Sequence, residues 1–445
     1  MNKTVQRIII YSLLIVNYLI LLGFWWVYSG DLFSSPSLSG PLLALGRVAG
    51  LLGAIQILLQ LILIGRVKWV ETAFGLDKLS RLHRWNGYLI LGLIVAHPIL
   101  ITQAYAIINS TTYAGQYIDF LKNWDTLLRA FAGYIILLAT IGLSITIIRR
   151  RLKYETWYYV HLLNYIAIAL IFGHQLRFGT DAQGWWFRGY WYFVYGFAFG
   201  NLIWYRFLRP LLKFTKHDFH ISRVEPEDPN GIATSVYITG DKIRNFKIKA
   251  GQFAIFRFFQ RGFWTQAHPF SFSMIPKNGE LRLTAKKLGD YTNLMPHLTP
   301  GVEVLIDGPH GRFTEEVITK DKLLFIAGGI GITPIRALLE SLGPQEKHII
   351  LLYANKSPAE KIFAEELAEL SYLHDIKIID IYSDERIAGA QFGRLDQAML
   401  HQLVPDLTER DVFLCGPPPM MDALKKALKN LGLPKKQFHW ERFAL

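Results

Sequence analysis

The stretch of sequence that decides the fold is LHRWNGYLILGLIVAHP, residues 82–98, in which two histidines bracket a run of apolar residues. A second stretch, HLLNYIAIALIFGH at residues 161–174, repeats the arrangement. Each lies within an apolar segment long enough to cross a bilayer. Because an ionisable side chain is costly inside a membrane, four histidines placed in this way point to a function. They are His83, His97, His161 and His174.

The spacing of these histidines predicts cofactor ligands. At a rise of about 1.5 Å per residue, the histidines of the first stretch lie about 21 Å apart along a helix, and those of the second about 20 Å apart. Two helices that each carry an upper and a lower imidazole at matching depth predict bis-histidine ligation of two stacked hemes. Two axial ligands leave no open position on the iron, which suits electron transfer. The alternative for any one of them is a packed, hydrogen-bonded histidine.

The rotation of the side chains about each helix fits this hypothesis only in part. At about 100° per residue, fourteen residues return to within about 40° of the same face, whereas thirteen leave His161 and His174 about 140° apart. Pro98 predicts a distortion of the first helix. The second spacing has no explanation in helix geometry alone.

Composition places the chain among membrane proteins. Of 445 residues, 51% are hydrophobic, and the excess lies before Arg209. The net charge of +13 is no argument for a nucleic-acid partner, because basic residues collect beside the apolar segments, as at residues 149–153. The one cysteine, Cys415, excludes an internal disulfide and argues against cysteine-ligated zinc or iron–sulfur sites.

Six segments are predicted to span the membrane, and the first is expected to remain as a helix rather than a cleaved signal. They are residues 7–28, 42–64, 82–107, 126–148, 157–178 and 185–207. Lysines and arginines cluster after the second, fourth and sixth, which predicts an integral cell-membrane protein with both termini in the cytoplasm. The inner histidine pair is then His83 with His161, and the outer pair is His97 with His174.

Two arginines accompany the histidines. Arg47 lies at outer depth in the second segment, and Arg84 follows His83 at inner depth. Both are predicted to pair with heme propionates, whose buried charge needs a partner. The alternative is that each side chain extends to the lipid head groups.

The pattern changes after Lys216. Short alternating runs at residues 233–238, 253–258, 281–285 and 302–306, separated by turn residues, predict a small antiparallel barrel. From Lys322 onward, apolar runs at residues 323–327, 348–353, 376–382 and 412–414 alternate with helical patterns and predict a parallel sheet with crossover helices. The expected fold is therefore a polytopic all-α membrane domain (residues 1–209) followed by a β-barrel domain (217–318) and an α/β nucleotide-binding domain (319–445).

Two motifs in the barrel suggest a flavin site. HPFSFS at residues 268–273 offers hydroxyls, an imidazole and backbone groups along a strand. KKLGDYT at residues 286–292 offers a glycine turn, a helix start, a hydroxyl and cations, which together suit a pyrophosphate. The alternative for each motif alone is an ordinary turn.

Two further motifs follow strands of the parallel sheet. AGGIGITP at residues 327–334 has the strand–turn–helix context of a phosphate-binding loop, but Pro334 stands where the Rossmann fingerprint expects a third glycine. CGPPPM at residues 415–420 also comes directly after a strand. Because the carboxyl ends of parallel strands line one crevice, Cys415 is expected to face the same cleft as Gly329.

Together these motifs resemble the NADPH oxidase and ferric reductase superfamily over essentially the whole chain, including the histidine spacings of 14 and 13. The resemblance implies that the four histidines bind two b-type hemes, that FAD binds the barrel and that NADPH or NADH binds the α/β domain. The implied FAD residues are His268, Pro269, Phe270, Ser271, Ser273, Lys287, Gly289 and Thr292. The implied nicotinamide-nucleotide residues are Gly328, Gly329, Gly331, Thr333, Pro334, Cys415, Gly416 and Pro417. Phe443 best matches the near-terminal aromatic residue that stacks on the flavin.

The resemblance implies electron transfer from cytoplasmic NAD(P)H through FAD and two hemes to an acceptor outside. Arg47 resembles the arginine of the oxidase branch, which favours oxygen, giving superoxide, over a ferric chelate. A heme-free proton channel or transporter with a nucleotide-sensing domain is the alternative of a different class. NADPH is barely distinguished from NADH, although Lys356 could meet a 2′-phosphate. The sequence leaves oligomeric state, partner subunits and physiological role open.

Overall fold

The computed structural model describes residues 3–123, 125–145, 154–177, 184–228, 230–343 and 347–442. The chain divides into two compact units. The first comprises Met1–Phe74 and Lys78–Arg206, and the second comprises Gly75–Asp77 and Phe207–Leu445. The first unit is helical, and the second contains antiparallel sheets and a parallel sheet.

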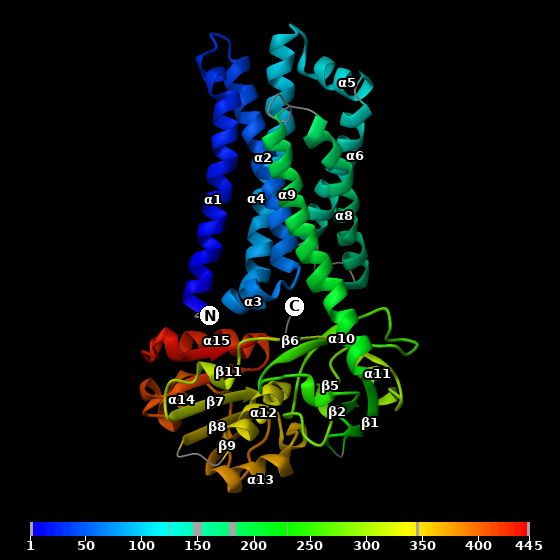
Figure 1. Ribbon diagram of the computed structural model, residues 1–445. Helices are drawn as coiled ribbons and strands as arrows, with labels where there is room; N and C mark the ends of the chain where they lie inside the picture. Colours follow the sequence, from blue (N-terminus) through cyan, green and yellow to red (C-terminus); the bar gives the residue numbers. More distant parts are fainter. Residues whose placement is uncertain are drawn as a thin grey trace. The chain divides into compact units, whose positions relative to one another are not determined.

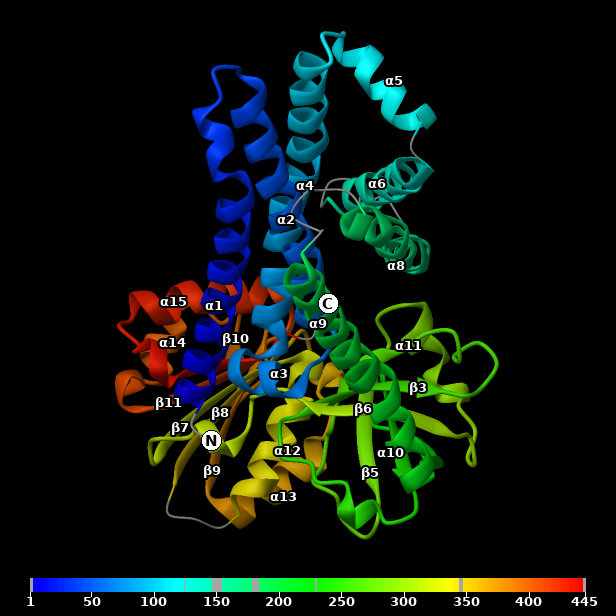
Figure 2. The ribbon, with the colours of Figure 1, turned by 45° about the horizontal axis from the view of Figure 1, so that its top comes forward.

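Helices form the first unit, and most of them are long (Figures 1 and 2). They are α1 (Lys3–Ser29), α2 (Ser39–Ile64), α3 (Lys68–Phe74), α4 (Leu76–Ile108), α5 (Tyr113–Asn123), α6 (Asp125–Ser144), α8 (Tyr154–Arg177) and α9 (Trp185–Ile203). Helices α6 and α8 lie side by side along their length in both views. Helix α4 continues through Pro98 without a break. Helix α4 also begins six residues before the predicted segment 82–107. His83 therefore lies within the helix and not at its start.

Within the described ranges, five helical segments are long and apolar enough to cross a membrane. They are Thr4–Ser34, Ser39–Ile64, Leu76–Ile108, Leu127–Ser144 and Thr156–Arg177. The sixth predicted segment is helical as α9, but its Trp- and Tyr-rich composition keeps it outside this group. The cluster of basic residues at 149–153 lies outside the described residues.

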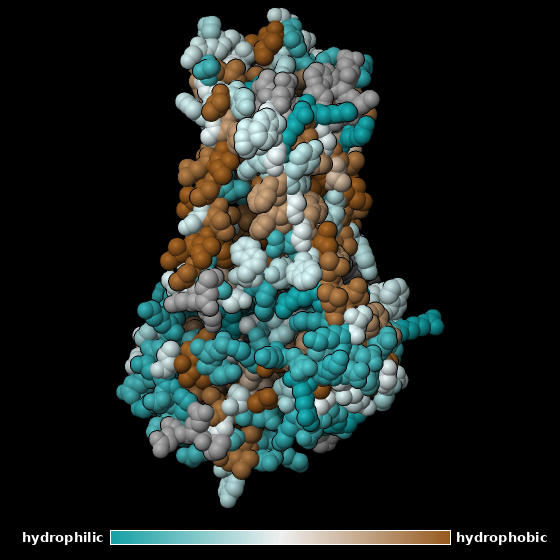
Figure 3. Space-filling model, viewed as in Figure 1, coloured by the Kyte–Doolittle hydropathy of each residue, from teal (hydrophilic) through white to brown (hydrophobic). Residues whose placement is uncertain are grey.

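The apolar side chains of the helices divide between the bundle and its outer surface. Trp191 and Phe187 of α9 are buried against Leu58 and Leu61 of α2. Helix α1, in contrast, exposes most of its apolar side chains, and Figure 3 shows this hydrophobic surface. Burial in hydrocarbon explains such a surface, because lipid replaces water around it.

Two three-stranded antiparallel sheets of the second unit enclose one core. One has the order β1 (His220–Pro226), β2 (Ala233–Thr239), β5 (Leu281–Lys286), and the other has the order β4 (His268–Ser271), β3 (Phe253–Phe258), β6 (Val304–His310). Bridges from His220 to Glu303 and from Phe272 to Leu283 join the two sheets. Helix α10 (Arg209–His217) precedes them, and α11 (Asp290–Leu294) follows β5. The alternating runs of the sequence therefore do form antiparallel strands.

A six-stranded parallel sheet follows, in the order β10-β9-β8-β7-β11-β12. Its strands are β7 (Lys322–Gly328), β8 (His348–Asn355), β9 (Ile376–Tyr382), β10 (Gln391–Phe392), β11 (Asp411–Cys415) and β12 (Phe438–Trp440). Helices α12 (Ile332–Leu342) and α13 (Ala364–His374) cover one face, and α14 (Gln397–Leu403) and α15 (Pro418–Asn430) cover the other. The sequence predicted the four central strands, whereas the short edge strands β10 and β12 carry too few residues for a pattern.

Candidate functional site

The structure brings the four membrane histidines together as two pairs. The ring centres of His83 and His161 lie 6.2 Å apart, with the rings at 63°. Those of His97 and His174 also lie 6.2 Å apart, at 60°. These are the pairs expected from the predicted depths, so the 13-residue spacing on α8 does not prevent both of its imidazoles from reaching α4.

The separation within each pair suits a metal between the two rings. Two metal–nitrogen bonds of about 2 Å each, together with the two half-rings, place the ring centres about 6 Å apart. No cluster of three or more His, Cys, Asp or Glu side chains that could hold a metal ion occurs in the described ranges. Two imidazoles at this separation fit a cofactor that supplies its other metal ligands itself, as heme does.

His97 is held in place by helix α2. Its Nδ1 donates a hydrogen bond to the backbone carbonyl of Gly46, at 2.8 Å, and a carbonyl can only accept. The other ring nitrogen, Nε2, is therefore the one that carries no proton and can bind a metal. A Cβ at Gly50 would lie 2.6 Å from the same Nδ1. The glycine thus leaves the space that the imidazole fills.

His161 is oriented by a hydroxyl instead. Ser144 donates its one proton to the carbonyl of Thr140, at 2.7 Å. Its oxygen therefore accepts from Nδ1 of His161 and from Nε1 of Trp157, each at 3.1 Å. The Trp157 ring also stacks on the imidazole, with centres 5.2 Å apart. As in His97, Nε2 is left as the nitrogen available to a metal.

A buried polar chain supports the helix turn that carries His83. Gln60 donates to the backbone carbonyl of His83 at 3.0 Å, and Asn86 donates to Gln60 at 3.1 Å and to the carbonyl of Gln56 at 2.9 Å. Gln56 in turn donates to the hydroxyl of Tyr18 at 2.8 Å. These hydrogen bonds were not predicted from the sequence, although amide side chains in apolar segments are a signal for such pairing.

A cavity of about 310 Å³ adjoins the outer histidine pair. It is mainly apolar, and Arg47, His97 and His174 are among its polar lining residues. Arg47 is half-buried, with its guanidinium 3.3 Å from the Ser29 hydroxyl. Such a cavity, apolar with few convergent polar groups, is typical of a small-molecule or cofactor site. Arg84, at the inner pair, is exposed.

The HPFSFS motif forms strand β4 and the residues after it. The His268 imidazole packs on the Tyr291 ring, with centres 4.0 Å apart, and the Phe270 ring is nearly parallel to it, with centres 6.4 Å apart. Pro269, the residue between His268 and Phe270 in the sequence, is half-buried, and Ser271 is buried. The Tyr291 hydroxyl is buried, and no hydrogen-bond partner for it occurs among the described residues. Burial raises the pKa of Tyr291, so this is a neutral hydroxyl left for a ligand.

The 286–292 motif forms the turn into α11. The Thr292 hydroxyl accepts from the backbone amides of Leu288 and Gly289 at 3.0 and 3.2 Å, which caps the helix. Lys287 is exposed, and a Cβ at Gly289 would meet nothing within 4 Å. The turn is therefore open to solvent on its glycine side.

The glycine loop and the cysteine motif meet at the switch point of the parallel sheet. The chain runs from β7 outward to β10 and then returns to the other side of β7 as β11. A Cβ at Gly331 would lie 2.3 Å from the carbonyl oxygen of Cys415, and one at Gly328 would lie 2.5 Å from Met420. Ligands of open α/β sheets bind at such a point. Gly329 has φ +50° and open space beside it, as a phosphate site requires.

Several predicted site residues face the protein rather than an open cleft. Thr333 and Pro334 are buried in α12, and the Thr333 hydroxyl donates to the carbonyl of Ile330 at 3.0 Å. Burial, together with the charge of Glu441, raises the pKa of the Cys415 thiol well above its usual range. That thiol therefore stays protonated and is no nucleophile. The buried carboxylate of Glu441 near Cys415 was not predicted from the sequence.

Two further predicted site residues directly follow Cys415 in the sequence. Gly416 lies against the Gly328 backbone, since a Cβ there would lie 3.1 Å from the Gly328 nitrogen. Pro417 begins the turn into α15. Phe443 lies outside the described residues.

Three family models match the chain in the order of its domains. Residues 49–172 match the ferric reductase like transmembrane component. Residues 231–314 match an FAD-binding domain, and residues 325–426 match the oxidoreductase NAD-binding domain. The first range contains three of the four paired histidines and ends two residues before His174, and the other two ranges contain the four loop motifs.

Individual relatives cover only part of the chain. The glycine betaine monooxygenase reductase subunit of Chromohalobacter salexigens is 33% identical over 183 residues, which are 39% of this chain and 48% of that protein. The ferredoxin reductase component of the 3-ketosteroid-9-alpha-monooxygenase of Mycobacterium tuberculosis is 31% identical over 205 residues, 45% of this chain and 56% of that protein. The chain thus spans about half the length of these relatives.

Among solved structures, the FAD/NAD-binding domain of nitric oxide dioxygenase from Vibrio cholerae aligns with 51% of this chain and 99% of its own, at 23% identity and a TM-score of 0.45. The matched domains, in contrast, extend from the membrane helices to the nucleotide-binding sheet. The chain has the domain order of the NADPH oxidases and ferric reductases: a region that matches the ferric reductase like transmembrane component precedes an FAD-binding and an NAD-binding domain.

Proposed function

We propose that the chain carries electrons from cytoplasmic NAD(P)H to an acceptor on the outer face of the cell membrane. When bound, FAD would accept hydride and release single electrons, and two b-type hemes would pass these one at a time. The observation that carries the proposal is the equal 6.2 Å separation of both histidine pairs, which lie in two helices that are each long enough to cross a membrane.

The protein's own groups would hold and orient these cofactors. Nε2 of His97 and of His161 is left free by the hydrogen bonds that Nδ1 makes, and their partners would be His174 and His83. Arg84 would pair with a propionate of the inner heme. A bis-histidine site of this kind leaves no metal position for substrate, so the site is suited to electron transfer and not to acid–base chemistry.

Flavin and nucleotide would bind the second unit. The β4 motif from His268 to Ser273, with the unpaired hydroxyl of Tyr291, would contact FAD, and the turn with Lys287, Gly289 and Thr292 would lie near its phosphates. The loop from Gly328 to Gly331 and the adjacent Cys415–Pro417 turn would hold the nicotinamide nucleotide at the switch point.

We propose oxygen as the acceptor, with superoxide as the product. The support is Arg47, whose cationic group lines the outer cavity together with His97 and His174, where an anionic product would form. The second candidate is a ferric chelate, since the ferric reductase-like domain is shared by both kinds of enzyme.

The proposed topology places the flavin and nucleotide domains in the cytoplasm. It takes α9 as a sixth span, which leads to the second unit on the side of the N-terminus. The basic residues after α2 and α9 support this orientation through the positive-inside rule.

Reduction of ferricytochrome c by the detergent-purified protein, with NADPH and FAD added, tests the acceptor. Inhibition by superoxide dismutase is the expected result. Reduction that is insensitive to the dismutase, with rapid turnover of a ferric chelate, would assign the metal-reductase function instead. Absence of a Soret band after heme-supplemented expression would reject the heme proposal and favour a heme-free channel.

Replacing Ser144 by alanine is expected to raise the midpoint potential of the inner heme. The hydrogen bond from Nδ1 of His161 makes the imidazole a stronger donor, which favours oxidised iron. Loss of about 1 kcal/mol of hydrogen bonding corresponds to about 40 mV for a one-electron couple. Redox titration of the Soret band measures it, with Ser144→Thr as the control that keeps the hydroxyl. Equal potentials in the alanine and threonine variants would refute the contact.

Replacing Lys356 by alanine is expected to raise KM for NADPH about tenfold and to leave KM for NADH nearly unchanged, because only NADPH has a 2′-phosphate for the ammonium group. Lys356 is exposed directly after β8, and its carbonyl accepts from the amide of Asp384 at 2.9 Å. Steady-state kinetics with both nucleotides measure the effect. Lys377→Ala, near the amino end of the neighbouring strand β9, is the control. An equal effect on both nucleotides contradicts the assignment.

A further inference from the structure

Strand β5 presents two different faces. Leu281, Leu283 and Ala285 point into the core of the antiparallel sheets. Arg282, Thr284 and Lys286, which alternate with them, belong to the other face. Arg282 is nevertheless buried, with a side chain only 4% exposed. A buried guanidinium on the outer face of a strand requires acidic partners from another element.

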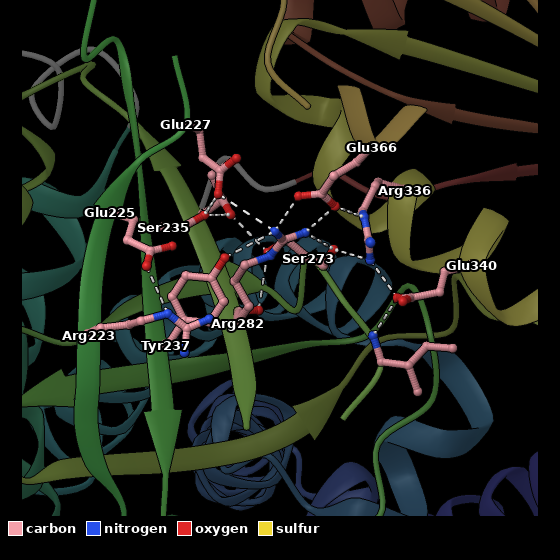
Figure 4. A network of polar contacts seen from close by, with 12 residues as sticks. Arg223, Glu225, Glu227, Ser235, Tyr237, Ser273, Arg282, Arg336, Glu340 and Glu366 are labelled. Atoms are coloured by element: carbon pink, nitrogen blue, oxygen red, sulfur yellow. Dashed lines mark hydrogen bonds and ion pairs between the residues drawn. The ribbon is translucent and has the colours of Figure 1, made fainter. Parts of the chain in front are cut away.

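One acidic partner, Glu227, lies in the flavin-binding domain itself, 3.7 Å from the guanidinium, and the closer one comes from the nucleotide-binding domain (Figure 4). Arg282 donates from both terminal nitrogens to the carboxylate of Glu366 in α13, at 2.6 and 2.9 Å. Arg336 of α12 approaches the same carboxylate, with Nε 2.6 Å from it. One carboxylate thus lies between two guanidinium groups, one from the flavin-binding domain and one from the nucleotide-binding domain. We call Arg282, Glu366 and Arg336 the domain clamp.

The domain clamp is attached directly to both cofactor motifs. The carbonyl of Ser273, the last residue of the HPFSFS motif, accepts from Arg282 and from Arg336, each at 3.2 Å. Arg336 lies in the first turns of α12, the helix that begins right after the glycine loop ends at Gly331. Each motif is therefore only a few residues away from the same pair of guanidinium groups.

Ser273 serves the clamp with its side chain as well. Its hydroxyl is fully buried, accepts from Nε of Arg282 at 3.1 Å and lies 2.8 Å from the hydroxyl of Thr284. Glu340 completes the arrangement, because it pairs with Arg336 and accepts from the amide of Ile275 at 3.0 Å.

A second ion pair joins the same two domains. Lys286 pairs with Glu360, which precedes α13, and the two side chains are 16% and 24% exposed. It uses the same face of β5 as Arg282, four residues further along. Because the two domains are joined at two positions along one strand, these ion pairs fix the relative orientation of the domains as well as the distance between them.

The charge states favour these contacts. Burial alone would raise the pKa of Glu366, but hydrogen bonds from Arg282 and the charges of Arg282 and Arg336 outweigh it and lower the pKa. The carboxylate is therefore ionised at neutral pH. Buried ion pairs contribute little net stability because desolvation offsets their attraction, but they do specify geometry. Domains in one chain move relative to one another unless their interface is extensive and apolar.

We infer that the domain clamp is a positioning device, which holds the nicotinamide loop at a fixed distance from the flavin motif so that hydride transfer is fast. The inference rests on the proposed function. Glu366 and the two arginines touch neither reacting group in this role; they act through α12 and Ser273. Because a shift of about 1 Å at a reacting pair can cost about 100-fold in rate, loss of the clamp affects chemistry more than binding.

Anaerobic stopped-flow reduction of the flavin in the full-length, detergent-purified protein tests this inference. Glu366→Gln keeps the shape of the side chain but removes its charge. We expect flavin reduction by saturating NADPH to slow about tenfold or more, with KM for NADPH and FAD content within twofold of the wild type. Reduction by dithionite, which needs no nicotinamide geometry, is expected to be unchanged.

Glu280→Gln is the matched control. Glu280 pairs with Arg223 at 2.5 Å, and Arg223 stacks on the Tyr237 ring, 3.5 Å from its centre, so this ion pair stays within the flavin-binding domain. It is expected to reduce flavin at the wild-type rate. Equal NADPH rates in Glu366→Gln and in the wild type would overturn the inference. A wild-type protein whose flavin NADPH does not reduce would overturn the proposed function instead.

Charge-reversal variants of the Lys286–Glu360 ion pair test the same inference if Glu366→Gln loses FAD or unfolds. Lys286→Glu and Glu360→Lys each place like charges together and are expected to slow NADPH-driven reduction, whereas the double exchange restores the pair and the rate. Recovery in the double variant supports positioning. Three variants that all match the wild type would reject it.

Discussion

Replacing His97 by leucine is expected to abolish delivery of electrons to the outer acceptor, while NAD(P)H still reduces the flavin. Leucine fills the space of the imidazole but offers no ligand to a metal. Loss of a residue that merely orients a ligand costs about 10- to 100-fold in metal affinity, so loss of the ligand itself costs more. Heme content should fall from two to one per chain, and dismutase-sensitive cytochrome c reduction should fall about 100-fold or more.

A neighbouring glycine gives an independent route to the same site. In Gly50→Ala the new methyl group would lie 2.6 Å from Nδ1 of His97, so the ring must move. We expect a weaker outer heme and a partial loss of the same activity. Gly92→Ala is the control in α4, because a Cβ there meets nothing within 4 Å. Loss of flavin reduction in His97→Leu would indicate misfolding, and normal heme content would exclude His97 as a ligand.

The sequence predicted what depends on periodicity. Apolar runs located the membrane helices, alternation located β2, β3 and β5, and turn residues located the loops at the switch point. Periodicity fails where an element is short or unusual. Strands β10 and β12 comprise two and three residues, and the aromatic composition of α9 leaves its hydropathy below that of the other long helices.

The partners of each site residue were beyond the sequence, because they come from distant elements. Nothing near His97 in the sequence indicates that the carbonyl of Gly46 accepts a hydrogen bond from its Nδ1. Nor does anything near His161 indicate that the Ser144 hydroxyl accepts one from the Nδ1 of His161. Ser273 shows the same limit: its motif indicates a flavin contact, and nothing in the sequence indicates that its buried hydroxyl accepts a hydrogen bond from Arg282. Only packing decides which side of a strand a short motif presents.

Arg282 shows how far strand alternation alone leads. Alternation in β5 assigns Arg282 to the face opposite Leu281 and Leu283, where sequence alone predicts solvent. The structure covers that face with α13, whose Glu366 carries the matching charge. Docking between domains depends on shape and on charge across hundreds of positions, so no local pattern encodes it.

Replacing Gly331 by alanine is expected to lower kcat/KM for NAD(P)H about 100-fold while FAD stays bound. A Cβ at this position would lie 2.3 Å from the carbonyl oxygen and 2.6 Å from the carbonyl carbon of Cys415. Both are backbone atoms, so no change of rotamer relieves the overlap. The glycine loop or the end of β11 must shift, and a displacement of about 1 Å at a site that positions a reacting group costs about 100-fold in rate.

Gly329→Ala provides the comparison, because the two glycines differ in the kind of constraint. Gly329 has φ +50°, which costs an alanine about 1 kcal/mol, but its Cβ would enter open space. A cost of that size corresponds to a change of about fivefold at most. Anaerobic flavin reduction at a series of NADPH concentrations, together with FAD content, separates the two variants. Equal losses of activity in Gly331→Ala and Gly329→Ala would mean that backbone strain, and not the contact between the glycine loop and the end of β11, limits nucleotide binding. That result would contradict the proposed nucleotide site at the switch point.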